Sequence, residues 1–335
     1  MKTKNNFLQY LRLIRPQGAS ATAATILIGS LIMGLRDIFL LSIIFIIGVI
    51  SHIFVFVLNE YVDIRIDRKS KDLQEKPLVS GIIPKQHAIF IAILSGFLVY
   101  ALTIFFFPSP YTIIFLSLAL FLGGIYDFYG KKIPGSDGIL ASGCLFICLF
   151  GASTVSINFT NLIYIVALSC FFHIVFNNAV EGGLKDVDHD FIAGAKTTVT
   201  RLGVKINDGK LKISKKFLIF SYAIKLAYIG LVILAGFQPE LNLWRSKYFI
   251  SQTIVIFLIV IVFFTLYKFW HPSDFNRPKL IKLFSIHEIS AYSIGPIILI
   301  PLIGYWVALL LILIPILWFI VFNIILYGKP MQPQV

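Results

Sequence analysis

The sequence predicts an all-α membrane protein, a polytopic bundle of nine or ten membrane-spanning helices with short connections. First, only 13% of the 335 residues are charged and 58% are hydrophobic, whereas about 25% are charged in soluble proteins. Second, the mean hydropathy is +0.89, and apolar runs near the ~20 residues that span a bilayer recur along the chain. Third, basic residues gather on alternate connections. We expect a single membrane domain over residues 1–335.

Residues 1–19 alternate basic and aliphatic side chains and predict an amphipathic helix on the membrane surface that ends near Pro16. Residues 20–327 are expected to form the transmembrane bundle. The expected spans are 20–35, 38–60, 88–107, 111–126, 138–155, 161–180, 216–237, 249–270, 286–304 and 306–327. The last two divide near Tyr305 and Trp306, either at an interfacial turn or within one long bent helix, which gives ten spans or nine.

The distribution of Lys and Arg predicts the orientation. With the N-terminus inside and ten spans, 25 of the 29 basic residues lie on the inner side. The other four are Arg36, Arg245 and Lys247 outside, and Lys225 within a span. Cytoplasmic loops carry such an excess, so we expect a multi-pass protein of the cell membrane. The net charge of +13 then reflects these loops and attraction to anionic lipid, and we exclude nucleic acid as a partner.

A polar, charged segment follows the second apolar run. Asn59, Asp63 and Asp67 recur every four residues, so they share one face if the helix continues through them. Carboxylates stacked in this way repel each other unless a cation lies between them. The arrangement therefore calls for a divalent ion, or for paired Lys and Arg.

A second segment of this kind follows the sixth run, where Asp186 and Asp190 are again four residues apart. Both segments are expected on the cytoplasmic side. Hard oxygen ligands suit Mg²⁺, which proteins commonly bind together with substrate phosphates. Basic residues that could balance a diphosphate lie in the same loops: Arg65, Arg68, Lys69, Lys71, Lys131, Lys132, Lys185, Lys196 and Arg201. Metal and fixed cations would stabilise a departing diphosphate, while the apolar helices hold a hydrocarbon chain.

Two other interpretations stand beside this one. Charged residues beyond a membrane helix are commonly solvated ends or headgroup contacts. A transporter or lipid-binding protein without chemistry would also explain the apolar composition and the basic face. Neither gives a reason for oxygen ligands repeated at four-residue spacing on one side of the membrane.

The two motifs resemble the signatures of the UbiA family of intramembrane prenyltransferases. Asn59-x-x-x-Asp63-x-x-x-Asp67 is followed by Lys76-Pro77-Leu78-Val79-Ser80-Gly81, and Asp186-x-x-x-Asp190 by Gly194-Ala195-Lys196-Thr197-Thr198 and Leu202-Gly203. The resemblance implies a bundle of about nine spans around a central cavity. It also implies transfer of an isoprenyl chain from a polyprenyl diphosphate to a lipophilic or aromatic acceptor, with Mg²⁺ as cofactor.

The resemblance also implies roles for individual residues. Asp63, Asp67, Asp186 and Asp190 would hold the metal and its diphosphate, assisted by Asn59. Either Lys131 or Lys132, near Tyr126, matches a basic position that helps to bind diphosphate, and Arg15 would help from the N-terminal helix. Two details depart from the family pattern: Glu60 stands where many members have Asp, and the interval from Tyr126 to Lys131 is one residue longer.

A polar stripe in the sixth span leads to the second motif. His173, Asn177, Asn178 and Glu181 fall on one side of the expected helix. Polar groups are costly in lipid, so the stripe is expected to face the cavity that receives the acceptor, with Asn177 as a substrate-binding residue. Whether the acceptor offers an aromatic ring or the hydroxyl of a glycerol-phosphate lipid stays open at this point.

Overall fold

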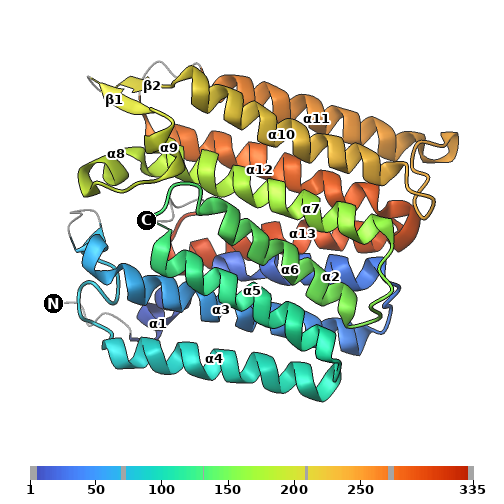
Figure 1. Ribbon diagram of the computed structural model, residues 1–335, viewed down its shortest axis with the longest axis horizontal. Helices are drawn as coiled ribbons and strands as arrows, with labels where there is room; N and C mark the ends of the chain where they lie inside the picture. The colour runs from blue at the N-terminus through green and yellow to red at the C-terminus, as the bar shows by residue number, and fades with distance from the viewer. Residues whose placement is uncertain (1–5, 69–72, 131, 208–209, 271–274, 331–335) are drawn as a thin grey trace.

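The computed structural model describes residues 6–68, 73–130, 132–207, 210–270 and 275–330, and most of them are helical (Figure 1). The first half contains α1 (Asn6–Ile14), η1 (Pro16–Gly18), α2 (Ala19–Ile32), α3 (Ile38–Asp67), α4 (Lys85–Phe106), α5 (Pro110–Tyr129) and α6 (Asp137–Ser153). The second half contains α7 (Asn161–Phe176), η3 (Asn177–Gly182), α8 (Gly183–Ala193), α9 (Thr198–Arg201), β1 (Lys205–Asn207), β2 (Lys210–Lys212), α10 (Lys215–Gly236), η4 (Ser246–Tyr248), α11 (Phe249–Phe269), α12 (Arg277–Ile298) and α13 (Ile300–Tyr327).

The distribution of side chains is the reverse of that in a soluble protein. Phe97 on α4 is 67% exposed and Phe257 on α11 is 63% exposed, whereas Lys225 and His287 are fully buried. Large apolar side chains on the outside suit a lipid environment. Within the described residues, seven helical stretches are long and apolar enough to cross a membrane: 38–67, 85–106, 110–129, 161–188, 215–236, 246–269 and 300–327.

The expected number of nine or ten spans is not confirmed. Three expected spans correspond to helices outside this set. α2 has only 14 residues, because it ends at Ile32, two residues before Gly34 takes a positive φ of 98°. α6 has 17 residues, and α12 begins with a charged turn that contains Arg277 and Lys279. The chain leaves the helical conformation at Gly304, with a φ of 80° and a ψ of 163°, close to the expected division, whereas Leu299 between α12 and α13 keeps helical dihedral angles.

Both acidic segments lie at the same end of the bundle. Figure 1 shows the carboxyl ends of α3 and α5 together with α8 and α9 on one side, while the connection between α12 and α13 lies at the opposite end. This placement agrees with the expectation that the two motifs face the same side.

The connection after α7 departs from the expected loop. The helix runs on through a π-helical stretch, η3, into α8, and such stretches often occur at functional sites. A short antiparallel hairpin of β1 and β2 follows, with Ile206 opposite Leu211. These two side chains pack onto the apolar cluster of Phe176, Phe217 and neighbouring residues, so the hairpin is a small β element in a chain expected to be all-α.

α2 and α6 cross at very close range. A Cβ on Gly151 would lie 2.0 Å from the carbonyl oxygen of Ile26 and would clash with it. Only glycine permits this approach. The crossing fixes α2, and with it the segment that carries Arg15, against the rest of the bundle.

Candidate functional site

The end of α3 brings together the residues of the first motif. α3 continues to Asp67, so Asn59, Asp63 and Asp67 share one face as the spacing predicts. Asp63 is 8% exposed and Asp67 is 2% exposed. Carboxylates this deeply buried need cationic or hydrogen-bonded partners, because burial of an unpaired charge is costly.

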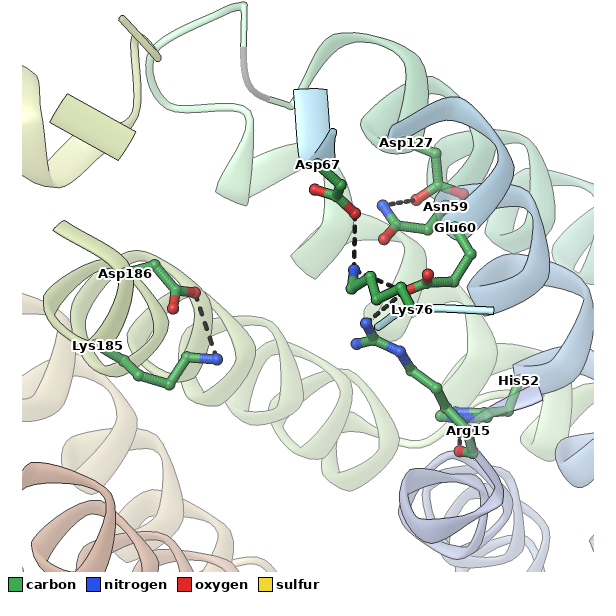
Figure 2. A network of polar contacts seen from close by, with 9 residues as sticks. All are labelled: Arg15, His52, Asn59, Glu60, Asp67, Lys76, Asp127, Lys185 and Asp186. Atoms are coloured by element: carbon green, nitrogen blue, oxygen red, sulfur yellow. Dashed lines mark hydrogen bonds and ion pairs between the residues drawn. The ribbon is translucent and has the colours of Figure 1, made fainter. Parts of the chain in front are cut away.

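Lys76 is one of these partners, and we had not predicted it as a site residue. Its Nζ donates to Asp67 Oδ2 at 2.8 Å and to Glu60 Oε1 at 3.0 Å (Figure 2). The turn after α3 brings it back, since Leu78 and Ile83 are buried against α3 and α4 and Gly81 takes a positive φ of 75°. The sequence feature that could have pointed to Lys76 is the Lys76-Pro77 pair that follows the first acidic motif.

Arg15 meets the same acidic face from the other side. Its Nη2 donates to Glu60 Oε1, and its backbone is left-handed, with a φ of 46°. His52 Nε2 donates to the Arg15 carbonyl oxygen at 3.0 Å, which helps to hold this conformation (Figure 2). Burial alone lowers the pKa of Arg15, but Glu60, with smaller contributions from Tyr327 and Asp67, raises it above its ordinary value. Glu60 therefore belongs to an ion-pair network.

Asp127 of α5 adds a carboxylate that sequence reasoning missed. Asn59 Nδ2 donates to Asp127 Oδ1 at 3.1 Å, while Asp127 Oδ2 is buried and has no hydrogen-bond partner in the described part of the chain. The hydrogen bond turns the amide oxygen of Asn59 away from Asp127 (Figure 2). The only sequence signal was its position directly after Tyr126.

The second motif lies across from the first, on α8 (Figure 2). The Asp186 side chain is 43% exposed, and its Oδ2 lies 3.3 Å from Lys185 Nζ. Asp190 is half-buried one turn farther on, so the two carboxylates share a face as expected. Between them, Asp188 accepts a 2.6 Å hydrogen bond from Arg277, which ties α8 to the start of α12.

A hydrogen-bond network links the two halves beside these motifs. Asn178 Nδ2 donates to the Tyr126 hydroxyl at 2.7 Å and to Asp137 Oδ1 at 2.6 Å. Thr198 donates to the other oxygen of Asp137. Tyr126, a predicted substrate-binding residue, thus accepts a bond from η3. No pattern in the sequence indicated a role for Asp137.

Other predicted residues lie outside this inner group. Arg68, Lys132 and Lys196 are exposed at the same end of the bundle, and Lys132 lies 5.4 Å from the ring centre of Tyr129. Lys131, together with the Lys69 and Lys71 that we considered as counter-charges, falls outside the described residues. Asn177 hydrogen-bonds Glu288 on α12, so the structure does not join it to the acidic motifs.

The side-chain oxygens of this site are of the kind that bind Mg²⁺. Asn59, Asp63, Asp67, Asp186 and Asp190 offer carboxylate and amide oxygens, the ligands that Mg²⁺ prefers, and buried Asp127 Oδ2 adds one more acceptor. Among the described residues, no three His, Cys, Asp or Glu side chains gather closely enough to form a ready metal site. Protein ligands from the two motifs would therefore need phosphate oxygens or waters to complete a coordination shell.

The model of the UbiA prenyltransferase family matches residues 22–289, which include both acidic motifs and the helices that carry them. The chain belongs to the UbiA prenyltransferase family. The resemblance seen in the motifs is confirmed. No curated protein sequence matches the chain closely enough to count as a relative.

Solved structures of UbiA homologues share the fold. A homologue from Archaeoglobus fulgidus bound to GPP and Mg²⁺ has a TM-score of 0.63 and 18% identity, over 86% of this chain and 99% of that one. A digeranylgeranylglyceryl phosphate synthase structure has a TM-score of 0.65 and 21% identity, over 90% and 99%. The apo homologue from Aeropyrum pernix K1 has a TM-score of 0.64 and 15% identity, over 84% and 98%.

Proposed function

We propose that this UbiA-family chain is an integral membrane prenyltransferase that moves an isoprenyl chain from a polyprenyl diphosphate to an acceptor. The observation that carries the proposal is the placement of two acidic segments, at the end of α3 and on α8, at the same end of an apolar bundle (Figure 1). Family membership and the homologue that holds GPP and Mg²⁺ support it.

The acidic residues would bind the metal and the diphosphate. Asp63 and Asp67 from α3 and Asp186 and Asp190 from α8 would share the ion, with the Asn59 amide oxygen oriented by Asp127. When bound, Mg²⁺ would neutralise the diphosphate and stabilise the charge that develops as it leaves. Mg²⁺ usually keeps few protein ligands and takes the others from phosphate and water, as the open arrangement of these carboxylates allows.

The basic residues would take part as fixed cations. Lys76 and Arg15 already stand on the acidic face, where each could exchange a carboxylate partner for a phosphate oxygen. Lys132, Lys196 and Arg68, which are exposed at this end of the bundle, would attract the diphosphate, and Lys131 would assist them. Tyr126 would line the same region from α5, held by Asn178.

The bond changes follow from the leaving group. The C–O bond between the allylic carbon and the diphosphate breaks, and its electron pair leaves with the diphosphate. The carbon, which becomes cationic, forms a bond to a nucleophilic carbon or oxygen of the acceptor, which then loses a proton. The apolar helices that hold the isoprenyl chain would have to exclude water, which would otherwise capture the cation.

We place the reaction in a single membrane domain with the acidic ends on the cytoplasmic side, following the distribution of basic residues. The test is product formation by purified protein in nanodiscs, given farnesyl or geranylgeranyl diphosphate and a panel of aromatic and glycerol-phosphate acceptors. Mg²⁺-dependent transfer that is absent in EDTA and in Asp63→Asn supports the proposal. Lipid or anion binding that survives Asp63→Asn and Asp190→Asn, without any transfer, would favour a transporter or lipid-binding protein instead.

A further inference from the structure

Arg15 has a backbone conformation that residues other than glycine rarely adopt. Its φ of 46° and ψ of 57° are left-handed, and the only other non-glycine residue with a positive φ in the described part of the chain is Asn242. Asparagine tolerates this region. An arginine stays there only when its surroundings hold it.

The local sequence favours a different conformation at Arg15. Pro16 follows it directly, and the residue before a proline prefers an extended backbone. Arg15 also lies between α1 and η1, outside both helices, so no helical hydrogen-bond pattern imposes its dihedral angles. Contacts with other parts of the fold must therefore select the left-handed conformation.

His52 of α3 supplies the first of these contacts. Its Nε2 lies 3.0 Å from the Arg15 carbonyl oxygen, which can only accept, so Nε2 carries the proton. In the neutral ring Nδ1 is then an acceptor, and the Thr22 hydroxyl lies 3.3 Å from it. The histidine is 3% exposed, and its ring stacks on Phe56 with the ring centres 4.0 Å apart. The imidazole is therefore oriented by the protein itself.

Trp318 of α13 holds the next carbonyl group. Its Nε1 donates to the Pro16 carbonyl oxygen at 2.7 Å. The indole packs against Phe45 and Phe322, with ring centres 5.7 Å and 5.0 Å away. Two consecutive carbonyl groups are thus bound by side chains from two different helices. We call His52 and Trp318 the carbonyl clamp.

Gly18 provides the space for the histidine of the clamp. Its own φ of −90° is open to any residue, so its backbone does not require glycine. A Cβ at this position, however, would lie 2.8 Å from His52 Cε1. Because the ring is buried and stacked on Phe56, it has little room to move away. Close approach of η1 to α3 therefore depends on Gly18.

The clamp determines where the Arg15 guanidinium lies. Glu60, which accepts from Arg15 Nη2, follows His52 by eight residues in α3, or about 12 Å along the helix axis. Arg15 thus runs beside α3 from its anchored carbonyl group to the acidic face (Figure 2). The planar guanidinium can bind two phosphate oxygens at once, and Mg²⁺ and diphosphate are expected at this face.

We propose that His52 and Trp318 are positioning residues, which fix the left-handed backbone of Arg15 and so direct its guanidinium to the diphosphate of the prenyl donor. The inference rests on the proposed prenyl transfer, since it explains how that site holds one of its cations. An arginine that is already ordered loses less conformational entropy when it binds a phosphate oxygen. The clamp should therefore raise the affinity for the diphosphate.

The test uses two amide side chains of different reach. His52→Gln places an N–H group near the position of Nε2 and can still donate to the Arg15 carbonyl oxygen, whereas His52→Asn places it near Nδ1, too far away. Affinity for a non-reactive prenyl thiolodiphosphate with Mg²⁺ is measured on the full chain in nanodiscs. We expect His52→Asn to bind at least fivefold more weakly than wild type, and His52→Gln to stay within twofold of wild type.

A second set of variants separates positioning from a general loss of stability. In Arg15→Met, which lacks the guanidinium, His52→Asn should cause no further loss of affinity, because the clamp acts through Arg15. Trp318→Phe, which removes the indole N–H and keeps an aromatic ring, should also weaken binding. Trp306→Phe is its matched control, since Trp306 lies on the same helix and is 79% exposed.

Three results would overturn the proposal: wild-type affinity in both His52→Asn and Trp318→Phe, equal losses in His52→Asn and His52→Gln, or a fivefold loss that persists in the Arg15→Met background. If His52→Asn does not fold, Trp318→Phe and its control decide.

A measurement without ligand separates this proposal from the proposed function. The coupling energy between Arg15 and Glu60 in unfolding should fall by at least half in His52→Asn, whether or not the protein transfers prenyl groups. An unchanged coupling energy would contradict the clamp and would leave the Mg²⁺-dependent transfer assay unaffected. Absence of transfer by wild type would instead overturn the proposed function.

Discussion

The ammonium of Lys76 lies 2.8 Å from a carboxylate oxygen of Asp67. A divalent cation at the acidic face of α3 would compete with this ammonium for the Asp67 carboxylate, because both would neutralise its charge. Lys76 should therefore stabilise the metal-free protein and at the same time weaken metal binding.

Replacement of Lys76 should expose this competition. In Lys76→Gln, Asp67 loses the ammonium of Lys76, and we expect a loss of about 1–3 kcal/mol of stability without metal. Added Mg²⁺ should raise the melting temperature of this variant more than that of wild type. Thermal unfolding in detergent with EDTA or Mg²⁺ measures both effects. Lys85→Gln, at an exposed lysine on the first turn of α4, is the control; an equal response in the two variants would contradict the competition.

Arg15 and Glu60 should be energetically coupled. Both side chains are largely buried, and removal of one partner of a buried pair costs about 3–5 kcal/mol in fully buried cases. Arg15→Met and Glu60→Gln should each destabilise the protein, and the double variant should lose less than the sum of the two losses. The unfolding free energies of wild type, the two single variants and the double variant give the coupling energy. Additive losses would mean that the contact between Arg15 and Glu60 does not contribute to stability.

Asp127 should act by orienting Asn59. Asp127→Ala removes the acceptor of the Asn59 amide, and loss of such an orienting partner typically lowers metal affinity or activity about 10–100-fold. Asp127→Asn keeps a carbonyl oxygen as acceptor and should restore most of the Mg²⁺ affinity. Titration of prenyl transfer with Mg²⁺ in the two variants distinguishes them. If Asp127→Asn and Asp127→Ala lower the Mg²⁺ affinity equally, the Asp127 carboxylate itself is needed. That result would indicate that Asp127 binds the metal and does not only orient Asn59.

The crossing of α2 and α6 should not tolerate a methyl group. Gly151→Ala would place a Cβ against the Ile26 carbonyl, and overpacking of this kind costs about 1–3 kcal/mol. Gly138→Ala is the matched control, because Gly138 lies on the same helix with no atom near its Cβ position. Thermal unfolding of the two variants should show a loss only for Gly151→Ala. Equal melting temperatures would contradict the close crossing.

Local spacing made part of this site predictable. Asn59, Asp63 and Asp67 could be placed on one face because four-residue spacing on a helix is a property of the sequence alone. The same reasoning placed Asp186 and Asp190 together, and apolar runs located most of the long helices.

Contacts between distant helices were not predictable in this way. Asn59 meets Asp127 across 68 residues of chain, and Asn178 meets Asp137 across 41, and no periodicity records such pairs. The number of spans was not confirmed for another reason: α12 begins with charged residues and α2 is short, so hydropathy alone does not define either helix as a span. Lys225, the basic residue expected within a span, is buried over the ring of Phe176 by tertiary packing, which no periodicity in the sequence records.

The most direct test of the central claim is binding of a non-reactive prenyl thiolodiphosphate with Mg²⁺ to wild type, Asp63→Asn, Asp190→Asn and the double variant. If α3 and α8 hold one metal–diphosphate between them, wild type binds only with Mg²⁺, each single variant loses at least tenfold in affinity, and the double variant loses little more. Binding that is independent of Mg²⁺, or an Asp190→Asn protein with wild-type affinity, would contradict a site shared by the two acidic helices.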